Sequence, residues 1–363
     1  MPYTARVLWI TDLHPVILGA LQLIVLSVPA CALAWLMRRG GIPGGAPAAA
    51  IVGGIVAGLL IGATVAGRVA PELHDRLFIG GVDETIALAD LHSEHARQRM
   101  ALQATGVSPE ATPELQAQQL QEAEQAQAMI TTARANHAAH LRWAGLAVLA
   151  LLGATVIGGC SRRRLTLSLA RAPSMLLGMT LACTATLLTA RLIGVPWRDA
   201  VVLGIATSAP GIARHLMAPR TAVLPLRAIW SLWLPTAVAL LASVIDLPEL
   251  VNHARFWWLI ALGIVASSDL RWVCYWAAIR GTVRQWWGKY PWSIASRWMR
   301  DGAAPVQIML TFLAFGLDRN LGDIIAASLV GVATIELTRN VRCRIATLLD
   351  RDPATSIGDD AVS

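Results

Sequence analysis

The chain has 363 residues, of which 55% are hydrophobic and 15% are charged, and its mean hydropathy is +0.55. Soluble domains carry about 25% charged residues, so this composition excludes an ordinary soluble protein and indicates an integral membrane protein. The net charge of +7 would suggest a nucleic-acid partner in a soluble protein. In a membrane protein the placement of arginines matters more than their total, and we expect no nucleic-acid partner.

Apolar runs long enough to cross about 30 Å of hydrocarbon occur nine times along the sequence, and two of them are short. They predict an all-α fold, a polytopic membrane helical bundle of about nine spans. The expected spans are residues 15–37, 46–67, 141–160, 174–195, 199–218, 222–245, 256–280, 303–317 and 321–338.

Clusters of basic residues follow alternate spans, so nine alternating spans would place every cluster on one side of the membrane. The positive-inside bias then predicts a multi-pass protein of the cell (inner) membrane, with its N-terminus outside and its C-terminus in the cytoplasm. The clusters are Arg38 and Arg39; Arg162, Arg163 and Arg164; Arg214 and Arg220; Arg280, Arg284 and Lys289; Arg339, Arg342 and Arg344.

Composition divides the chain into four parts. Residues 1–83 hold the first two spans, and 84–140 form a polar insert rich in Ala, Gln and Glu. Residues 141–347 form a seven-span bundle, in which a connector rich in Trp and Arg near 284–300 predicts an interfacial helix. Residues 348–363 predict a disordered cytoplasmic tail.

The polar insert reads as two helices separated by breaks at residues 105–109 and 112–113, so we expect an antiparallel hairpin on the extracytoplasmic side. A thin apolar seam is expected between its arms, from Leu88, Leu91 and His95 on one and from Leu115, Leu120, Ala123 and Ile130 on the other. Such a hairpin either binds a partner or makes an oligomer contact, or it is a solvated structural insert.

Histidines recur in the hairpin at i,i+3, as His92 with His95 and as His137 with His140. Each pair shares a helical face and could contribute to a metal site. Folding the hairpin at its break sets the pairs at different heights, so we expect no metal and no cofactor. P-loop, nucleotide-binding glycine, HExxH and CxxC motifs are absent from the sequence, and we therefore expect no enzyme.

Asp269 and Arg271 lie near the middle of the expected seventh span. Ionisable groups at that depth are costly and are usually retained for ion handling or for pairing with another buried charge. A desolvated carboxylate can exchange a proton near neutral pH, and a nearby cation would compete with that proton. Ser267 and Ser268 could add oxygen ligands, and Arg271 could offset the negative charge of the empty site.

The alternative is an ion pair that fixes helix register. Residues at i,i+2 of a regular helix point to different faces, so either the helix is broken between Asp269 and Arg271 or each has another partner.

The fifth expected span is interrupted by Pro210 and Gly211, directly after Thr207 and Ser208. Broken helices expose backbone carbonyls and helix ends, which secondary transporters use to hold ions. Thr207 and Ser208 are therefore candidate ion-binding residues. Glu336, near the cytoplasmic end of the last span, is a secondary candidate that could simply reach the interface.

Three stretches resemble the monovalent cation:proton antiporter superfamily of sodium/proton exchanger-like proteins. Arg38-Arg39-Gly40-Gly41-Ile42-Pro43, followed by a Gly-rich span ending near Gly62, looks like its first two helices. Thr207-Ser208-Ala209-Pro210-Gly211 is similar to its unwound helix, and Arg300-Asp301-Gly302 resembles the entry to its closing helices.

The resemblance implies an antiporter-like fold, a homodimer and a carboxylate that alternates between proton and cation. Residues 227–235, which follow the broken helix, contain no acid. We therefore expect Asp269 to substitute for the family's carboxylate.

Two hypotheses for function follow. The first is an antiporter-like secondary transporter that exchanges Na⁺ or K⁺ for protons around the fifth and seventh spans, with those ions and membrane lipids as its partners. The second is a non-transporting membrane scaffold or sensor that presents the hairpin of residues 84–140 to a partner.

Overall fold

The computed structural model describes residues 15–104, 113–158, 162–209, 224–282, 291–299, 303–314 and 322–350. Within these ranges the chain forms helices and turns and no strand, which confirms the all-α fold class. The chain divides into two compact units. The first comprises residues 1–22 and 66–144, and the second comprises residues 23–65 and 145–363.

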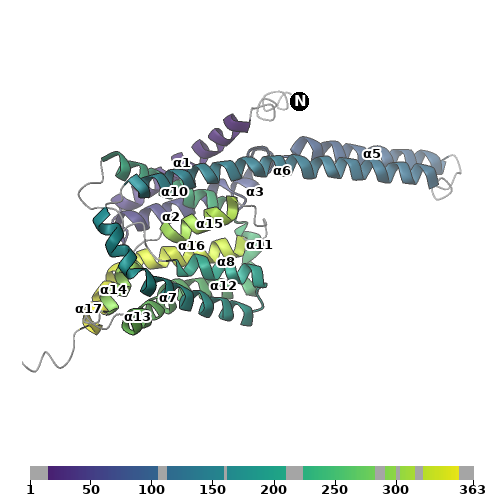
Figure 1. Cartoon of the computed structure of the whole chain (residues 1–363). Coiled ribbons are helices and arrows are strands. Elements are labelled where there is room, and N and C mark those ends of the chain that lie inside the picture. The colour runs from purple at the N-terminus through teal and green to yellow at the C-terminus, as the bar shows by residue number, and fades with distance from the viewer. Residues whose placement is uncertain are drawn as a thin grey trace, which may run out of the picture. The chain divides into compact units, whose positions relative to one another are not determined.

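The first unit is dominated by α5 (Val82–Ala104) and α6 (Pro113–Gly158), which run side by side in Figure 1. Three short helices precede α5, namely α3 (Ala66–Val69), α4 (Pro71–His74) and the π-helix η3 (Asp75–Ile79). Leu77 and Phe78 of η3 and Ile130 of α6 are buried. Apolar packing in this unit is therefore found at the end of the helix pair where α5 begins.

The first helix, α1 (Pro15–Arg39), contacts η3 through one polar side chain. Gln22 is fully buried, and its Nε2 donates a hydrogen bond to the backbone carbonyl of Leu77. A buried amide needs such a partner, because leaving it without one would cost about 1–3 kcal/mol.

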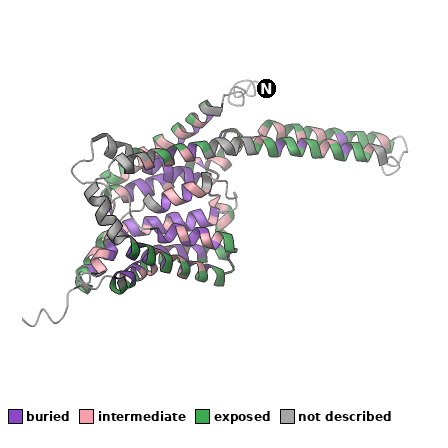
Figure 2. Ribbon diagram, viewed as in Figure 1, coloured by how far each residue is buried: buried purple, intermediate pink, exposed green. Residues whose placement is uncertain are grey.

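The second unit is a bundle in which α2 packs on α10, α7 on α8 and α13, and α12 on α16. Figure 1 shows these helices as a stack, and Figure 2 shows that α16 is buried along most of its length. Its elements are α2 (Gly45–Ile61), α7 (Arg162–Leu192), α8 (Trp197–Ser208), α10 (Leu224–Ser243), α11 (Leu247–Val251), α12 (Ala254–Val265), the π-helix η5 (Ala266–Leu270), α13 (Arg271–Thr282), α14 (Pro291–Trp298), α15 (Ala303–Ala314), α16 (Gly322–Leu337) and α17 (Arg339–Leu349).

Four helices of the described ranges are long and apolar enough to cross a membrane: Ile17–Arg39, Gly45–Val69, Pro173–Leu192 and Ala254–Gly281. A fifth span arises if α16 and α17, which are bent by 62°, cross together. Several membrane-compatible helices are thus present, whereas the number nine stays a prediction. The helices α8, α15 and α16 have 12, 12 and 16 residues. At 1.5 Å per residue each is shorter than the hydrocarbon thickness.

Large apolar side chains stay exposed along helices of the second unit, as lipid-facing side chains do. Ile24 and Val28 of α1 are 57% and 62% exposed, and Trp257 and Trp258 at the start of α12 are 55% and 64% exposed. Tryptophan is enriched at membrane–water boundaries, so this pair is placed as expected for the end of a span.

Small residues bring the helices of the bundle unusually close. A Cβ atom added at Gly54 of α2 would lie 2.6 Å from the carbonyl oxygen of Pro235, and one at Gly58 would lie 2.6 Å from Cβ of Ala242. Both contacts are with α10. Close backbone approach of this kind is how membrane helices gain dispersion energy without a hydrophobic drive between them.

Glycine residues also allow α12 and η5 to pack closely against α16. A Cβ at Gly263 would collide with the backbone of Ala327, and one at Gly331 would collide with the Oγ of Ser267. The π-helix is therefore held directly against α16.

We expect Gly54→Ala to destabilise the protein by about 1–3 kcal/mol, because the added methyl group overpacks the α2–α10 contact. Thermal unfolding in detergent measures the loss. Gly153→Ala in α6 is the matched control, since nothing lies within 4 Å of a Cβ there. Equal stability of the two variants would contradict the close packing of α2 on α10.

Candidate functional site

The expected seventh span contains a π-helix where the sequence places its charged residues. Regular helix α12 ends at Val265, η5 covers Ala266–Leu270, and α13 begins at Arg271. A π-turn shifts the phase of the residues that follow it, and such turns are frequent at functional sites. The helix contains a π-turn here but continues without a break, and Asp269 and Arg271 each contact a different partner, which is the second of the two expected alternatives.

Asp269 differs in burial from the other candidate residues of this segment. Arg271 is fully buried, and Ser267 and Ser268 are each 1% exposed. The side chain of Asp269 is 70% exposed. The expected burial of the carboxylate is therefore not observed, because residues at i,i+2 lie on opposite helix faces and the face of Arg271 is the inward one.

Arg271 and Tyr275 of α13 reach the broken end of α8. The Nη2 of Arg271 donates a hydrogen bond to the carbonyl oxygen of Ala209, and the Tyr275 hydroxyl donates one to the carbonyl oxygen of Ser208, at 3.0 Å. The last carbonyls of a helix have no partner within that helix and carry a partial negative charge. A guanidinium and a hydroxyl from another helix supply the missing donors.

Thr207 and Ser208 stand at this end of α8, where Ala209 leaves the helical conformation. α8 therefore ends where the sequence predicts the interruption, and Pro210 and Gly211 lie outside the described residues. Both hydroxyls are 1% exposed, and each bonds back to its own helix. The Oγ1 of Thr207 donates to the carbonyl of Leu203 at 2.7 Å, and the Oγ of Ser208 donates to that of Ile205 at 3.3 Å.

Asp269 has partners of its own. Its Oδ2 accepts a hydrogen bond from the Oγ of Ser268 at 3.1 Å, and its Oδ1 lies 3.9 Å from the Nη2 of Arg342 on α17. The structure thus brings Arg271 to the Thr207–Ser208 break and brings Asp269 to α17.

Glu336 is fully buried at the end of α16, with its Oε2 3.8 Å from the Nη1 of Arg339. The expectation that its side chain simply reaches the interface is wrong, because the side chain is fully enclosed by the protein. The backbone carbonyl of Glu336 also packs against Gly44. Gly44 has φ 94° and leaves no room for a Cβ.

Sequence reasoning missed Ser328 and Tyr275. Ser328 is 1% exposed on α16, which packs against η5, and neither its Oγ nor that of Ser267 has a hydrogen-bond partner among the described residues. A hydroxyl every few residues on an apolar helix is too common to single out. Tyr275 carried a usable signal, because it lies four residues after Arg271 and therefore on the same helical face.

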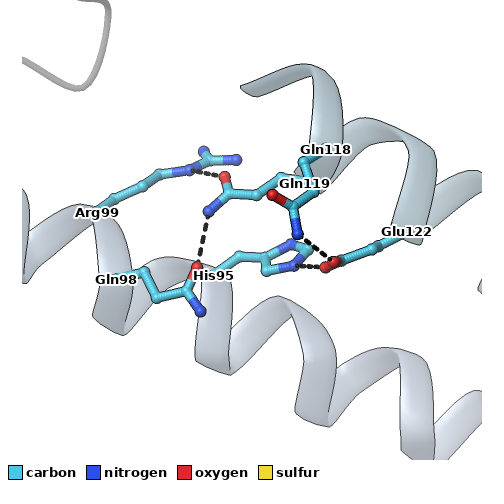
Figure 3. A network of polar contacts seen from close by, with 6 residues as sticks. All are labelled: His95, Gln98, Arg99, Gln118, Gln119 and Glu122. Atoms are coloured by element: carbon cyan, nitrogen blue, oxygen red, sulfur yellow. Dashed lines mark hydrogen bonds and ion pairs between the residues drawn. The ribbon is translucent and has the colours of Figure 1, made fainter. Parts of the chain in front are cut away.

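In the hairpin, a network of polar side chains joins α5 to α6 (Figure 3). The Nε2 of His95 lies 2.9 Å from the Oε2 of Glu122, whose Oε1 accepts a hydrogen bond from Gln118 at 3.1 Å. Gln119 donates to Gln98 and accepts from Arg99, both at 3.1 Å. His95 and Gln119 are 5% and 4% exposed, so this network lies between the helices.

The seam of the hairpin therefore differs from the expected apolar one. Leu120 was placed on it and is 62% exposed, so that assignment is wrong. Gln119, Ala126 and Ile130 are buried on α6. Consecutive residues of a helix are about 100° apart, and the face that contains Gln119 excludes Leu120.

The network also bears on metal binding. The described residues contain no group of three or more His, Cys, Asp or Glu side chains that could hold a metal ion. One ring nitrogen of His95 is engaged with Glu122. The side chains of His137 and His140 lie outside the described residues.

An open groove of about 450 Å³ lies beside the network. It is lined by Gln98, Ala101, Leu102, Leu115, Gln118, Gln119 and Glu122. Amide groups at its wall offer both donors and acceptors to an incoming polar group.

No family model, curated protein or solved structure matches this chain. The resemblance to cation:proton antiporters rests on its three short stretches of sequence.

We expect Arg271→Ala to destabilise the protein by about 3 kcal/mol, because it leaves the buried Ala209 carbonyl without its charged donor. Asp269→Asn is the matched control and should change stability by less than about 1 kcal/mol, since exposed ion pairs contribute little. Thermal unfolding in detergent measures both. A larger loss in Asp269→Asn than in Arg271→Ala would contradict the assignment.

Hydrogen bonds from His95 and then Gln118 lower the pKa of Glu122 below its ordinary value of 4.5. A lowered folded-state pKa means that the stabilisation is present above the ordinary value and is lost as pH falls through the lowered one. We therefore expect the hairpin to lose stability on acidification from about pH 6 to about pH 3, and to lose less in Glu122→Gln. Thermal unfolding followed by circular dichroism at both pH values measures this. Glu124→Gln, which removes an exposed carboxylate of α6, should behave as the unaltered protein; an unchanged acid response in Glu122→Gln would refute the assignment.

Proposed function

We propose that the chain is a non-transporting membrane scaffold or sensor, formed on an antiporter-like bundle, that presents the polar hairpin of α5 and α6 to an extracytoplasmic partner. The observation that carries this proposal is the position of Arg271 at the broken end of α8.

A guanidinium is always protonated in proteins, so Arg271 is a permanent cation. It is fully buried and bonded to the Ala209 carbonyl. In secondary transporters, unwound carbonyls and helix C-termini of this kind coordinate the mobile cation. A Na⁺ or K⁺ ion approaching the end of α8 would have to displace a charge that is tethered to the same chain.

Asp269 lacks the enclosed setting that proton–cation competition needs. Its side chain is 70% exposed and lies beside the Arg342 guanidinium. The carboxylate therefore already faces a cation tethered to the same chain, which a Na⁺ or K⁺ ion would have to displace.

The hairpin has the exposed surface and the fixed helix pairing that a partner-binding element needs. Its helices are mainly exposed, as Figure 2 shows, and its buried polar network specifies the pairing of α5 with α6. The groove beside the network adds polar groups that a partner could recognise.

Antiport of Na⁺ or K⁺ for protons is the second candidate, and one observation favours it. The helices α8 and α15 have 12 residues each and contact one another. Short, interrupted helices that meet in this way mark the substrate site of many secondary transporters. In that reading Asp269 carries the exchanged ion, Arg271 balances the charge of α8, and Thr207, Ser208, Ser267 and Ser268 supply oxygen ligands.

Reconstitution distinguishes the two candidates. Purified protein in proteoliposomes that enclose a pH-sensitive dye is given a pulse of Na⁺ or K⁺. The scaffold proposal expects no proton flux above that of protein-free vesicles. Flux that is present in the unaltered protein and in Asp90→Asn, a carboxylate of the hairpin, but absent in Asp269→Asn would overturn the proposal in favour of antiport.

The hairpin is tested in native membranes with a photo-crosslinking amino acid at Gln118, beside the groove. We expect one defined adduct, with a second copy of the chain or with another protein, that is not formed from the same amino acid at exposed Thr180 of α7. Crosslinking from both sites alike, or from neither, would remove the support for a presented hairpin.

A further inference from the structure

The last helix, α17, has two unlike faces. One face is outward and apolar, with Val341 58%, Ile345 41%, Leu348 62% and Leu349 51% exposed. These four residues fall within one arc of the helix, because their spacings are those of one helical face. α17 contains no acidic residue between Arg339 and Leu349.

Residues next to this arc hold α17 against the bundle. Ala346 is fully buried in a cluster with Trp272, Tyr275 and Met299, and Arg342 lies 3.9 Å from Asp269. The orientation of the outward arc is therefore set by the contacts of neighbouring residues.

Helix α14 is hydrogen-bonded to the residue that follows α17. Both carboxylate oxygens of Asp350 accept hydrogen bonds from the first backbone amides of α14, at 3.0 Å from Trp292 and 2.8 Å from Ser293. The ring of Trp292 stacks on Trp276 of α13 at 4.8 Å. α14 and α17 thus form one platform on α13.

Arginines border the apolar arc. Arg344 is exposed on one side, and Arg342, with its side chain 13% exposed and paired with Asp269, lies on the other. The axis of α17 is bent by 62° from that of α16, and the two helices together are apolar enough to count as one bent membrane segment. An apolar arc with cationic borders on such a helix is typical of helices that lie in the membrane–water interface.

We propose that α17 docks on anionic phospholipid of the cytoplasmic leaflet, with Val341, Ile345 and Leu348 among the upper acyl chains and Arg344 at the headgroups. The occupant is lipid and not a protein because the bent pair of α16 and α17 is apolar enough for a membrane, and α17 carries three arginines and no acidic residue. Anionic headgroups supply the complementary charge. This contact is independent of whether the bundle transports ions.

The proposal also concerns Asp269. A lipid-bound α17 holds Arg342 beside Asp269, so the carboxylate that is exposed on the protein surface keeps a cation next to it.

The test uses the full chain in nanodiscs of mixed phosphatidylcholine and phosphatidylglycerol. A trace of either lipid, carrying a photoactivatable diazirine high in its acyl chain, is crosslinked and the labelled residues are read by mass spectrometry. We expect labels at Val341, Ile345 and Leu348, with the anionic probe favoured over the zwitterionic one. Labelling of Ile24 and Val28 on α1 shows within the same sample that each probe reaches lipid-facing side chains.

Two variants separate the apolar contribution from the charge. Arg344→Gln should reduce the preference for the anionic probe about fivefold and leave labelling by the zwitterionic probe unchanged. Ile345→Asn should reduce labelling of α17 by both probes, whereas Thr347→Asn, on the polar exposed side, should reduce neither. Added salt should weaken the preference as Arg344→Gln does, because it screens charge at the interface.

Equal labelling of α17 by the two probes would overturn the anionic preference. Labelling at Ile24 and Val28 with none on α17 would overturn the lipid contact itself and leave the arc to a protein partner. Because the salt titration uses the unaltered chain, the proposal can be refuted even where a variant fails to fold.

Discussion

The end of α8 lies inside the protein, and its carbonyl groups must find donors there. In lipid or in a dry bundle, no water is present to satisfy them, and each unsatisfied group costs several kcal/mol. Arg271 and Tyr275 provide those donors to Ala209 and Ser208. This contact ties α13 to α8 and sets which face of α13 is inward. The packing of α14 and α17 on the other faces of α13 follows from it.

Burying a guanidinium is itself costly, and the helix end offsets the cost. The partial negative charge at the C-terminus of α8 and the Ala209 carbonyl face Arg271, and the Tyr275 ring centroid lies 5.9 Å from its Cζ. The same interaction that completes the fold places a permanent positive charge where a transported cation would bind. Structure and proposed function are thus linked through one side chain.

Two neighbouring charges beside the π-helix η5 serve different sides of the molecule. Asp269 and Arg271 are about 200° apart on a regular helix, and the π-turn sets the phase of this pair relative to α12. Gly263 and Gly331 let η5 approach α16 so closely that the bulge is held in place. Small residues in this bundle therefore also determine where the side chains of η5 and α13 lie.

The sequence alone predicted apolar helices compatible with a membrane, the all-α fold and the point at which α8 ends. Each of these depends on local properties, namely composition, the length of apolar runs and the positions of Pro and Gly. Only the tertiary structure decided that Arg271 rather than Asp269 faces the break, that Gln119 replaces Leu120 on the hairpin seam and that Glu336 is buried. Arg271 and its acceptor Ala209 are 62 residues apart. The phase of a π-turn and the partner of a buried charge depend on helices distant in sequence, so no local pattern could have revealed them.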